Sequence, residues 1–442
     1  MIDIKEYKAI LVLGLPILIG QLGSIATGFV DNIMVGHYST SALAAASFCN
    51  NFFNTAMLAC MGFTMGITPL VGVMQSGKAK DIGQIMRSAV RVNAIFCMIV
   101  VAIMGSLYFF LDKMGQPAEL LPEIRPYYLL CLTGMIPITA FNIFAQWSYG
   151  INNSATPMWI ILGANVFNVI GNYILIFGNF GMPEMGLTGA GISTVAARFI
   201  AGFGMIAVFF CGKKYVEYRN GYLTKAVKPY SQGKIWMTSL PVSLQMAFET
   251  AAFSGAAVLC GWLGTIPLAA FQVIVVMGTL GFCIYYAIGA AVAVRVSNAA
   301  GEGSRKGMRR SAMAGYHIML VVMTMSSLIF VFAGPWIISM FTNDTAVIAL
   351  AVTLIVPMVF YQLGDATQIT FTNALRGTTN VMPMLWSAFI SYLVLGLPSS
   401  YLLGFTCGLG VYGIVMSFSV SLFTAAILYL YYFIRTTRPI KK

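Results

Sequence analysis

The chain alternates between long apolar stretches and short polar breaks along its whole length. A helix needs about 20 apolar residues to cross the hydrocarbon core of a bilayer, and each of these stretches reaches that length. The pattern therefore predicts an all-α polytopic membrane protein, whose helices satisfy their own backbone hydrogen bonds within the lipid. We expect twelve transmembrane helices, at residues 9–35, 43–73, 89–111, 124–147, 157–177, 187–211, 235–262, 267–294, 312–333, 347–371, 381–403 and 409–434.

Composition excludes several classes of protein. Hydrophobic residues make up 59% of the 442 positions and charged residues only 9%, whereas about a quarter of an ordinary soluble domain is charged. So few polar residues cannot cover the surface of a soluble protein of this length. A soluble enzyme, a nucleic-acid-binding protein and a disordered scaffold are thereby excluded.

The basic residues indicate the orientation of the chain. With a cytoplasmic N-terminus, all but three of the 25 Lys and Arg lie on the cytoplasmic side, the exceptions being Lys113, Arg125 and Arg198. Cytoplasmic loops of membrane proteins are enriched in Lys and Arg, so both termini are predicted to be cytoplasmic. The net charge of +12 then reflects topology and does not call for a nucleic-acid partner.

The two halves of the chain resemble each other. A Leu-Pro pair at Pro16 recurs at Pro241, and GINNSATPMW at 150–159 recurs as GTTNVMPMLW at 377–386. The matches keep the same order, which indicates a duplicated six-helix unit. Since six crossings are an even number, both copies have the same direction in the membrane, as in transporters built from parallel repeats. The predicted domains are an N-lobe at 1–212, a cytoplasmic linker at 213–234 and a C-lobe at 235–442.

Three acidic residues fall inside the predicted helices: Asp31, Glu249 and Asp365. Charged groups at such depth are costly and mark functional positions by default. Arg198 is the single basic residue at comparable depth and cannot neutralise three acids; a structural ion pair and a role in a site are both open for it. Because a low dielectric disfavours an ionised carboxylate, a proton or a small cation such as Na⁺ relieves that cost. We therefore predict that the three acids couple to H⁺ or Na⁺.

Polar residues accompany two of these acids. Tyr361 precedes Asp365 by one helical turn and shares its face. Asn168 and Asn172 also share a face, in an otherwise apolar helix. Two interpretations are open for these asparagines: they form hydrogen bonds between helices, or they belong to a binding site. If they face Asp31, they complete a polar cavity, and oxygen ligands of this kind suit a hard cation.

Pro16 lies inside the first predicted helix, where proline removes a backbone hydrogen bond and permits a kink. The kink is either a moving part or an instance of the tolerance of membrane helices for proline. Phe253 follows Glu249 by one turn, and Gln272 lies early in the eighth helix. Aromatic faces beside carboxylates favour lipophilic cations as ligands.

Motifs for other chemistry are missing. The chain has no GxxxxGK[ST] loop for ATP phosphates, none of its eight cysteines forms a CxxC pair, and its two histidines lie near helix ends. We therefore expect no cofactor and no enzymatic activity, with aspartyl chemistry inside the membrane left open as a third class of function.

Taken together, these segments resemble the MATE (multidrug and toxic compound extrusion) transporters, most closely the bacterial NorM-like branch. The resemblance covers nearly the whole chain and rests on LGLPILIGQL, FVDNIMVGHYSTSALAA, MQSGKAKDIGQIMRSA, NVFNVIGNYILIFG and YQLGDATQI followed by ALRGTTN. It implies two six-helix lobes around a V-shaped cavity, which rock between outward-open and inward-open states. The major facilitator superfamily also has twelve helices, but its acidic–basic signature is missing from 74–88.

The resemblance also implies roles for single residues in the N-lobe. Asp31 matches the acid of that lobe, and Pro16 matches the kink of the first helix. Asn168 and Asn172 match the polar pair of the fifth helix, and Asn172 stands where some members have an aspartate.

In the C-lobe, the resemblance implies a cation site and a drug site. Glu249, Tyr361 and Asp365 match the cation site, which implies that they bind Na⁺. The substrate-binding residues are expected to be Asp31, Phe253, Gln272, Asp344 and Asp365.

The sequence thus predicts a multidrug efflux antiporter of the bacterial inner membrane. It exports lipophilic, often cationic drugs in exchange for Na⁺ or H⁺, and it works as a monomer by alternating access. The alternative is a flippase for lipid-linked precursors, which has a related architecture. A flippase needs a more cationic cavity for pyrophosphate, and Arg198 alone against three acids argues against it.

Overall fold

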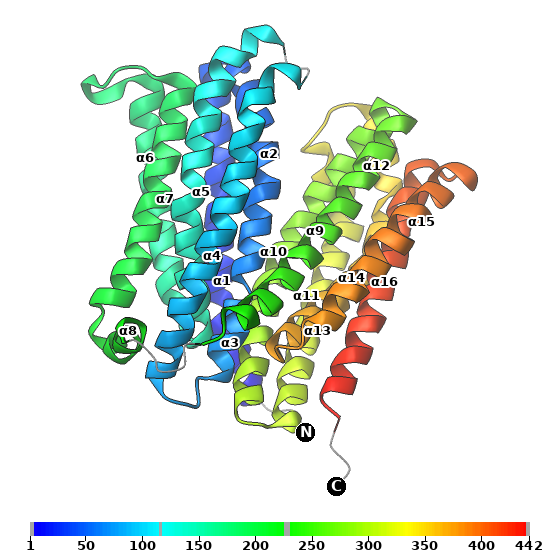
Figure 1. Cartoon of the computed structure of the whole chain (residues 1–442). Coiled ribbons are helices and arrows are strands. Elements are labelled where there is room, and N and C mark those ends of the chain that lie inside the picture. The colour runs from blue at the N-terminus through cyan, green and yellow to red at the C-terminus, as the bar shows by residue number, and fades with distance from the viewer. Residues whose placement is uncertain (1–3, 115–116, 225–229, 439–442) are drawn as a thin grey trace. The chain divides into compact units, whose positions relative to one another are not determined.

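The structure, a computed structural model, describes residues 4–114, 117–224 and 230–438. Within these residues every regular element is a helix (Figure 1), which confirms the predicted all-α class. The α-helices are α1 (Ile4–Tyr38), α2 (Thr40–Thr64), α3 (Ile67–Val73), α4 (Ala79–Leu107), α5 (Leu121–Gly150), α6 (Ala155–Phe177), α7 (Gly186–Cys211), α8 (Val216–Leu223), α9 (Gln232–Leu263), α10 (Thr265–Gly301), α11 (Arg305–Ser339), α12 (Thr345–Thr353), α13 (Ile355–Gly377), α14 (Met382–Ala388), α15 (Leu397–Tyr401) and α16 (Gly410–Thr436). The shorter segments are the 3₁₀ helices η1 (Tyr108–Lys113), η2 (Ala118–Leu120), η3 (Asn179–Gly181) and η4 (Lys213–Tyr215), and the π-helical η5 (Phe389–Gly396) and η6 (Leu402–Thr406).

Length and apolar composition qualify eleven helical stretches of the described residues to cross a membrane, or twelve if α12 and α13 count as one bent span. Large apolar side chains are exposed on these helices; Phe332, for example, is 81% exposed. Exposure of such side chains to water is unfavourable, whereas exposure to lipid is not. The predicted polytopic class is therefore confirmed.

Two of the predicted helices are irregular. Residues 347–371, expected as one helix, form α12 and α13 with a bend of 44° between them. Pro357 lies in the first turn of α13, where proline is tolerated but cannot continue a preceding helix. Residues 381–403 contain the π-helical η5, which ends two residues before Pro398, and Pro398 has no N–H to donate to the preceding turn.

Contacts group the chain into two compact units. Unit 1 comprises residues 1–18 and 244–442, and unit 2 comprises residues 19–243. Helices α1 and α9 each contribute to both units, and the two boundaries fall just after Pro16 in α1 and Pro241 in α9. The division into lobes by repeat stays a prediction, as does the V-shaped cavity.

The described part of the expected linker, residues 213–224 and 230–234, is partly helical and belongs to unit 2. Tyr215 of η4 and Tyr218 of α8 meet the buried ring of Trp147 edge-on, at 5.0 and 5.7 Å between centroids. α8 also lies directly against α4, because glycines at the crossing leave no room for a Cβ atom between the two backbones. The segment predicted as a linker therefore contains a packed helix, α8.

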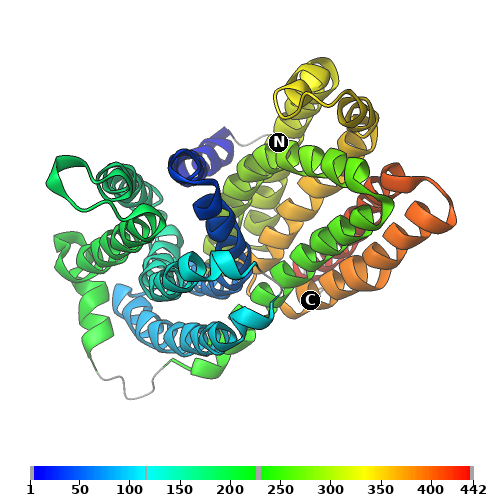
Figure 2. The ribbon, with the colours of Figure 1, turned by 90° about the horizontal axis from the view of Figure 1, so that it is seen from above.

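In unit 2, α5 packs against α2, α4 and α7, and α6 packs against α7 (Figures 1 and 2). The contact of α6 with α7 is close, because Gly189 of α7 brings its backbone against Leu175 of α6. Close backbone approach at small residues is typical of helix pairs in membranes. It positions the polar residues of α6 and α7 beside one another.

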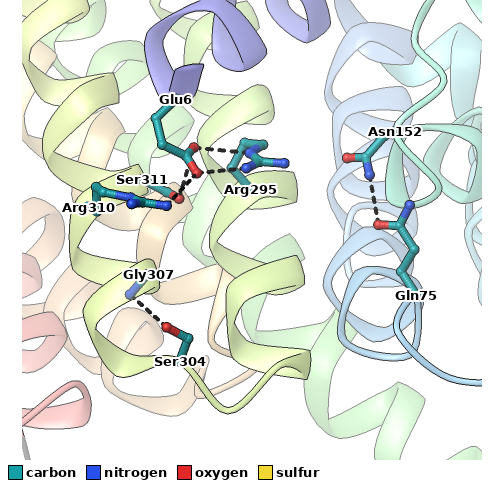
Figure 3. Close-up of polar contacts among 8 residues, drawn as sticks. All are labelled: Glu6, Gln75, Asn152, Arg295, Ser304, Gly307, Arg310 and Ser311. Carbon is teal, nitrogen blue, oxygen red and sulfur yellow. Dashed lines mark hydrogen bonds and ion pairs between the residues drawn. The ribbon is translucent and has the colours of Figure 1, made fainter. Parts of the chain in front are cut away.

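In unit 1, α10, α11, α13 and α16 pack together, and the first turns of α1 are anchored to them. The buried carboxylate of Glu6 accepts hydrogen bonds from Arg295 at 2.7 and 3.1 Å and from Ser311 at 3.3 Å, and it lies 3.6 Å from Nη2 of Arg310 (Figure 3). This ion pair fixes the start of α1 to α10 and α11.

Both ends of the described chain lie at the same end of unit 1. Arg309 of α11 donates to Oγ1 of Thr437, just after α16, at 2.9 Å, while the next residue, Arg310, contacts Glu6 near the start of α1. That this end lies in the cytoplasm stays a prediction. Four basic residues behind that prediction lie outside the described residues: Lys225, Lys228, Lys441 and Lys442.

Candidate functional site

Unit 2 contains a cavity of about 340 Å³. Its polar lining comes mainly from α1, α2, α6 and α7, and includes Ser24, Thr27, Asp31, Asn50, Asn168, Thr194 and Arg198. Apolar residues such as Val35, Ile138 and Ile161 form other parts of the wall. An apolar cavity of this size with a few convergent polar groups is typical of a small-molecule site.

Asp31 is held in this cavity by amides. The Asn172 nitrogen Nδ2 donates to Asp31 Oδ1 at 2.5 Å. Asn168, with its amide nitrogen turned toward α1, donates to the same oxygen at 2.8 Å and accepts from the Thr194 hydroxyl at 3.1 Å. The structure therefore brings Asp31 together with the two predicted amides, Asn168 and Asn172, and their role in coupling stays a prediction.

Arg198 of α7 lines the same cavity. Its Nη2 donates to the sulfur of Met57 at 3.6 Å, and its side chain lies against Gly134 of α5. Among the described residues, no ion pair within 4.0 Å joins Arg198 to Asp31. The structural ion pair that the sequence left open for Arg198 is thus not formed in this part of the chain.

A second set of carboxylates lies in unit 1. Glu249 Oε2 accepts a hydrogen bond from Gln245, one turn earlier on α9, at 2.8 Å. Gln368 of α13 donates to Glu249 at 3.3 Å and to Asp365 at 3.2 Å, so that one amide bridges two acids. The Thr372 hydroxyl donates to the amide oxygen of Gln368 at 3.2 Å, which fixes the direction in which the amide nitrogen points.

The other predicted residues of unit 1 divide into two groups. Phe253 and Tyr361 both contact Phe418 of α16, at 4.5 and 5.8 Å between ring centroids. Gln272 is an exposed residue of α10. Asp344 caps α12 by accepting from two of its backbone N–H groups at 2.8 and 3.3 Å. The ring of Phe418 thus contacts both Phe253 and Tyr361, whereas Asp344 has a structural contact as the N-cap of α12.

Pro16 lies inside α1, which continues as one helix from Ile4 to Tyr38. The preceding turn is closely packed, since a Cβ at Gly14 would lie 3.5 Å from the backbone oxygen of Ala287 in α10. The role of Pro16 as a kink stays a prediction.

Sequence reasoning missed the two glutamines of unit 1, although their spacing contained the signal. Gln245 lies one turn before Glu249, and Gln368 lies one turn after Asp365, so helical periodicity places each amide beside its acid. Thr194 could not be found in this way. Only the packing of α7 on α6 brings it to Asn168.

Carboxylates held by amide donors inside membrane-spanning helices are able to bind a proton or a hard cation. In residues 4–114, 117–224 and 230–438, no group of three or more His, Cys, Asp and Glu forms a candidate metal centre. The described contacts include no hydrogen bond between Tyr361 and Asp365, and their Na⁺ site with Glu249 stays a prediction.

Comparison with known proteins adds two findings. The MatE family model matches residues 16–174 and 241–402, two stretches that begin at Pro16 and Pro241. Several solved structures share the fold over almost the whole chain. The eukaryotic MATE transporter AtDTX14 has a TM-score of 0.86 at 16% identity and covers 98% of both chains.

Two further structures are similar to this chain. An outward-facing multidrug resistance MATE family transporter of the MOP superfamily has a TM-score of 0.81 at 18% identity, over 98% of this chain and 96% of its own. A MOP superfamily transporter from Pyrococcus furiosus has a TM-score of 0.82 at 17% identity, with the same coverage. The reverse polarity of its binding pocket suggests a different function for that transporter. At such low identity the likeness shows a common fold.

Proposed function

This chain belongs to the MATE family of transporters, and from that premise we propose that it is a multidrug efflux antiporter. MATE transporters are multi-pass membrane proteins and not enzymes. We place the chain in the NorM-like branch, as a monomer in a bacterial inner membrane with both termini cytoplasmic. Its substrates are lipophilic, often cationic compounds, which it exports in exchange for Na⁺ or H⁺ by alternating access.

The observation that carries the proposal is the environment of the three acids. Asp31 in unit 2, and Glu249 and Asp365 in unit 1, accept hydrogen bonds from amides, and no described basic residue forms an ion pair with them. An amide donates a hydrogen bond but leaves the negative charge in place, and an uncompensated charge in a low dielectric is costly. A proton or Na⁺ removes that cost, so these positions respond to the presence of the driving ion.

The driving force is sufficient for efflux. One elementary charge that crosses a potential of 100 mV releases about 2.3 kcal/mol, which supports a concentration ratio of roughly 50-fold at about 1.4 kcal/mol per tenfold. Coupling requires that the ion and the drug favour different states of the transporter or compete within one. Neutralising an acid therefore removes coupling without removing the cavity.

The test replaces each acid separately with its amide. Asp31→Asn, Glu249→Gln and Asp365→Asn are compared with wild type for ethidium efflux from cells, after expression and membrane insertion have been matched. Asp112→Asn is the control, because Asp112 forms an exposed ion pair with Arg125 at 2.7 Å, a contact of little energetic value. We expect efflux to fall at least about tenfold in one or more of the three variants. Loss of a contact to a charged group costs about 1.5–3 kcal/mol, and about 1.4 kcal/mol corresponds to a tenfold change. Unchanged efflux in all three contradicts the role assigned to the acids.

A second experiment identifies the driving ion. Purified protein in vesicles is given either a Na⁺ gradient or a pH gradient, and ethidium movement is recorded under each. Movement driven by one gradient alone assigns the ion, and movement under neither gradient contradicts antiport. The amide variants of the first experiment then show which unit carries the coupling.

A further inference from the structure

The guanidinium of Arg198 is unusual in its surroundings. Its Nη1 atom is buried and has no hydrogen-bond partner among the described residues, and its Nη2 reaches only the weakly accepting sulfur of Met57 at 3.6 Å. A guanidinium carries five N–H donors and no acceptor. Burying a guanidinium with so few acceptors is unfavourable. Because Arg198 lines the cavity, an anionic ligand there would compensate its charge.

The fold makes room for this group. A Cβ atom at Gly134 of α5 would lie 2.8 Å from Nη1 and 3.2 Å from Cδ of Arg198. Any larger residue at position 134 would push the guanidinium away. The glycine therefore allows the charge to lie against α5 at the edge of the cavity.

The cavity also contains a separate negative charge. Both amide hydrogen bonds to Asp31 end on its Oδ1 atom, which leaves Oδ2 for a ligand. Because Asp31 and Arg198 form no direct ion pair within 4.0 Å, one cavity presents two opposite charges at separate points of its wall. A ligand with one anionic and one cationic group is complementary to both.

We propose that Arg198 is the anion-binding residue of this cavity, and that the cavity takes lipophilic zwitterions whose carboxylate binds Arg198 and whose amine faces Asp31. A single guanidinium matches a single planar carboxylate, which it binds through two parallel hydrogen bonds. A pyrophosphate would require further cations, and Arg198 is the one basic residue that lines the cavity in the described part of the chain. The proposal rests on the proposed transport function and assigns to Arg198 the recognition of the anionic group of a substrate.

The test uses two probes that differ only in the carboxylate. Nε-dansyl-lysine is a zwitterion with an aromatic group, and its methyl ester keeps the amine but has no anion. Binding of each probe to the purified full-length chain in detergent is measured by dansyl fluorescence at equilibrium. Wild type should prefer the acid over the ester. Arg198→Met should weaken binding of the acid by about 10- to 100-fold, the range expected for a charge-assisted hydrogen bond, and should change binding of the ester by less than about twofold.

Three further variants separate recognition from folding. Arg198→Lys keeps the charge and should retain part of the preference for the acid. Gly134→Ala places a methyl group against Nη1 and Cδ of Arg198, both on a flexible side chain, and should weaken binding of the acid selectively, even if Arg198→Met fails to fold. Arg125→Met, at an exposed ion pair, should bind both probes as wild type does.

The outcomes are distinguishable from failure of the proposed function. A wild type that shows no preference for the acid, or that binds neither probe, overturns the proposal, and so does an equal loss of both probes in Gly134→Ala. The binding measurement needs no ion gradient. A preference that depends on Arg198 in a protein that moves no ethidium would therefore support the anion site and contradict the antiporter.

Discussion

Asp31 and Asn172 lie 141 residues apart along the chain, and the amide nitrogen of Asn172 lies 2.5 Å from Oδ1 of Asp31. The contact joins α1 to α6 inside unit 2. Asn172 is fully buried, whereas Asp31 lines the cavity. One oxygen of the Asp31 carboxylate is therefore held by a hydrogen bond within the protein, and the rest of the carboxylate is available to an ion or a ligand in the cavity.

The first prediction concerns this hydrogen bond. Asn172→Leu keeps a similar volume but removes the donor, which costs the ionised carboxylate about 1.5–3 kcal/mol. We expect ethidium efflux to fall by roughly tenfold or more. Asn220→Leu, on the exposed side of α8, serves as the matched control. Equal efflux in the two variants would show that Asn172 plays no part in transport.

The second prediction concerns the anchor of α1 in unit 1. Glu6→Gln removes the buried charge that accepts from Arg295 at 2.7 Å. Because Arg295 is partly exposed, with 28% of its side chain accessible, we expect a moderate loss of stability, about 1–3 kcal/mol. Thermal unfolding in detergent, followed by tryptophan fluorescence, measures it.

The control for this prediction is Glu302→Gln, at an exposed position after α10, where the effect should stay within about 0.5 kcal/mol. In the double variant Glu6→Gln with Arg295→Met, the two losses should not add, because each removes the same ion pair. Strictly additive losses would show that the pair does not stabilise the protein.

The third prediction uses a strained residue. Thr379 follows the end of α13 with φ of 62°, and Asn152, at the matching position of the similar sequence at 150–159, has the same φ of 62° after α5. A β-branched residue is disfavoured in this left-handed conformation, whereas glycine adopts it freely. Thr379→Gly should therefore stabilise the protein by about 1 kcal/mol. Thr378→Gly, where φ is −77°, should destabilise it, and a lower melting temperature for Thr379→Gly would contradict the assignment.

The fourth prediction concerns the attachment of α8. A Cβ at Gly83 of α4 would overlap the backbone carbonyl oxygen of Tyr218 in α8. A backbone cannot move aside as a side chain does, so Gly83→Ala should cost about 2–4 kcal/mol or lower the yield of folded protein. Gly163→Ala, on α6 with no atom within 4 Å of the new Cβ, should instead be neutral or stabilise by up to about 1 kcal/mol. Similar stability of the two variants would show that α8 is not packed on α4.

Hydropathy was sufficient for the broad fold, because each apolar stretch long enough to span the bilayer must form a helix there. It could not show the bend of 44° between α12 and α13 or the packing of α8. Pro357 is compatible with a continuous membrane helix as well as with a break. The charges of 213–234 predicted a linker, whereas Tyr215 packs on Trp147 and glycines allow α8 to pack closely on α4.

For the candidate site, the sequence by itself determined which acids enter the membrane, since an ionisable residue inside a long apolar stretch has no other place to lie. Helical spacing also determined that Asn168 and Asn172 share a face. The tertiary structure alone decided that this face meets Asp31, that Gln368 bridges Glu249 and Asp365, and that Arg198 pairs with neither Asp31 nor another described acid. The reason is that hydropathy sets which residues enter the lipid, whereas the rotation of each helix about its axis is set by side-chain packing against neighbours that are distant in the chain.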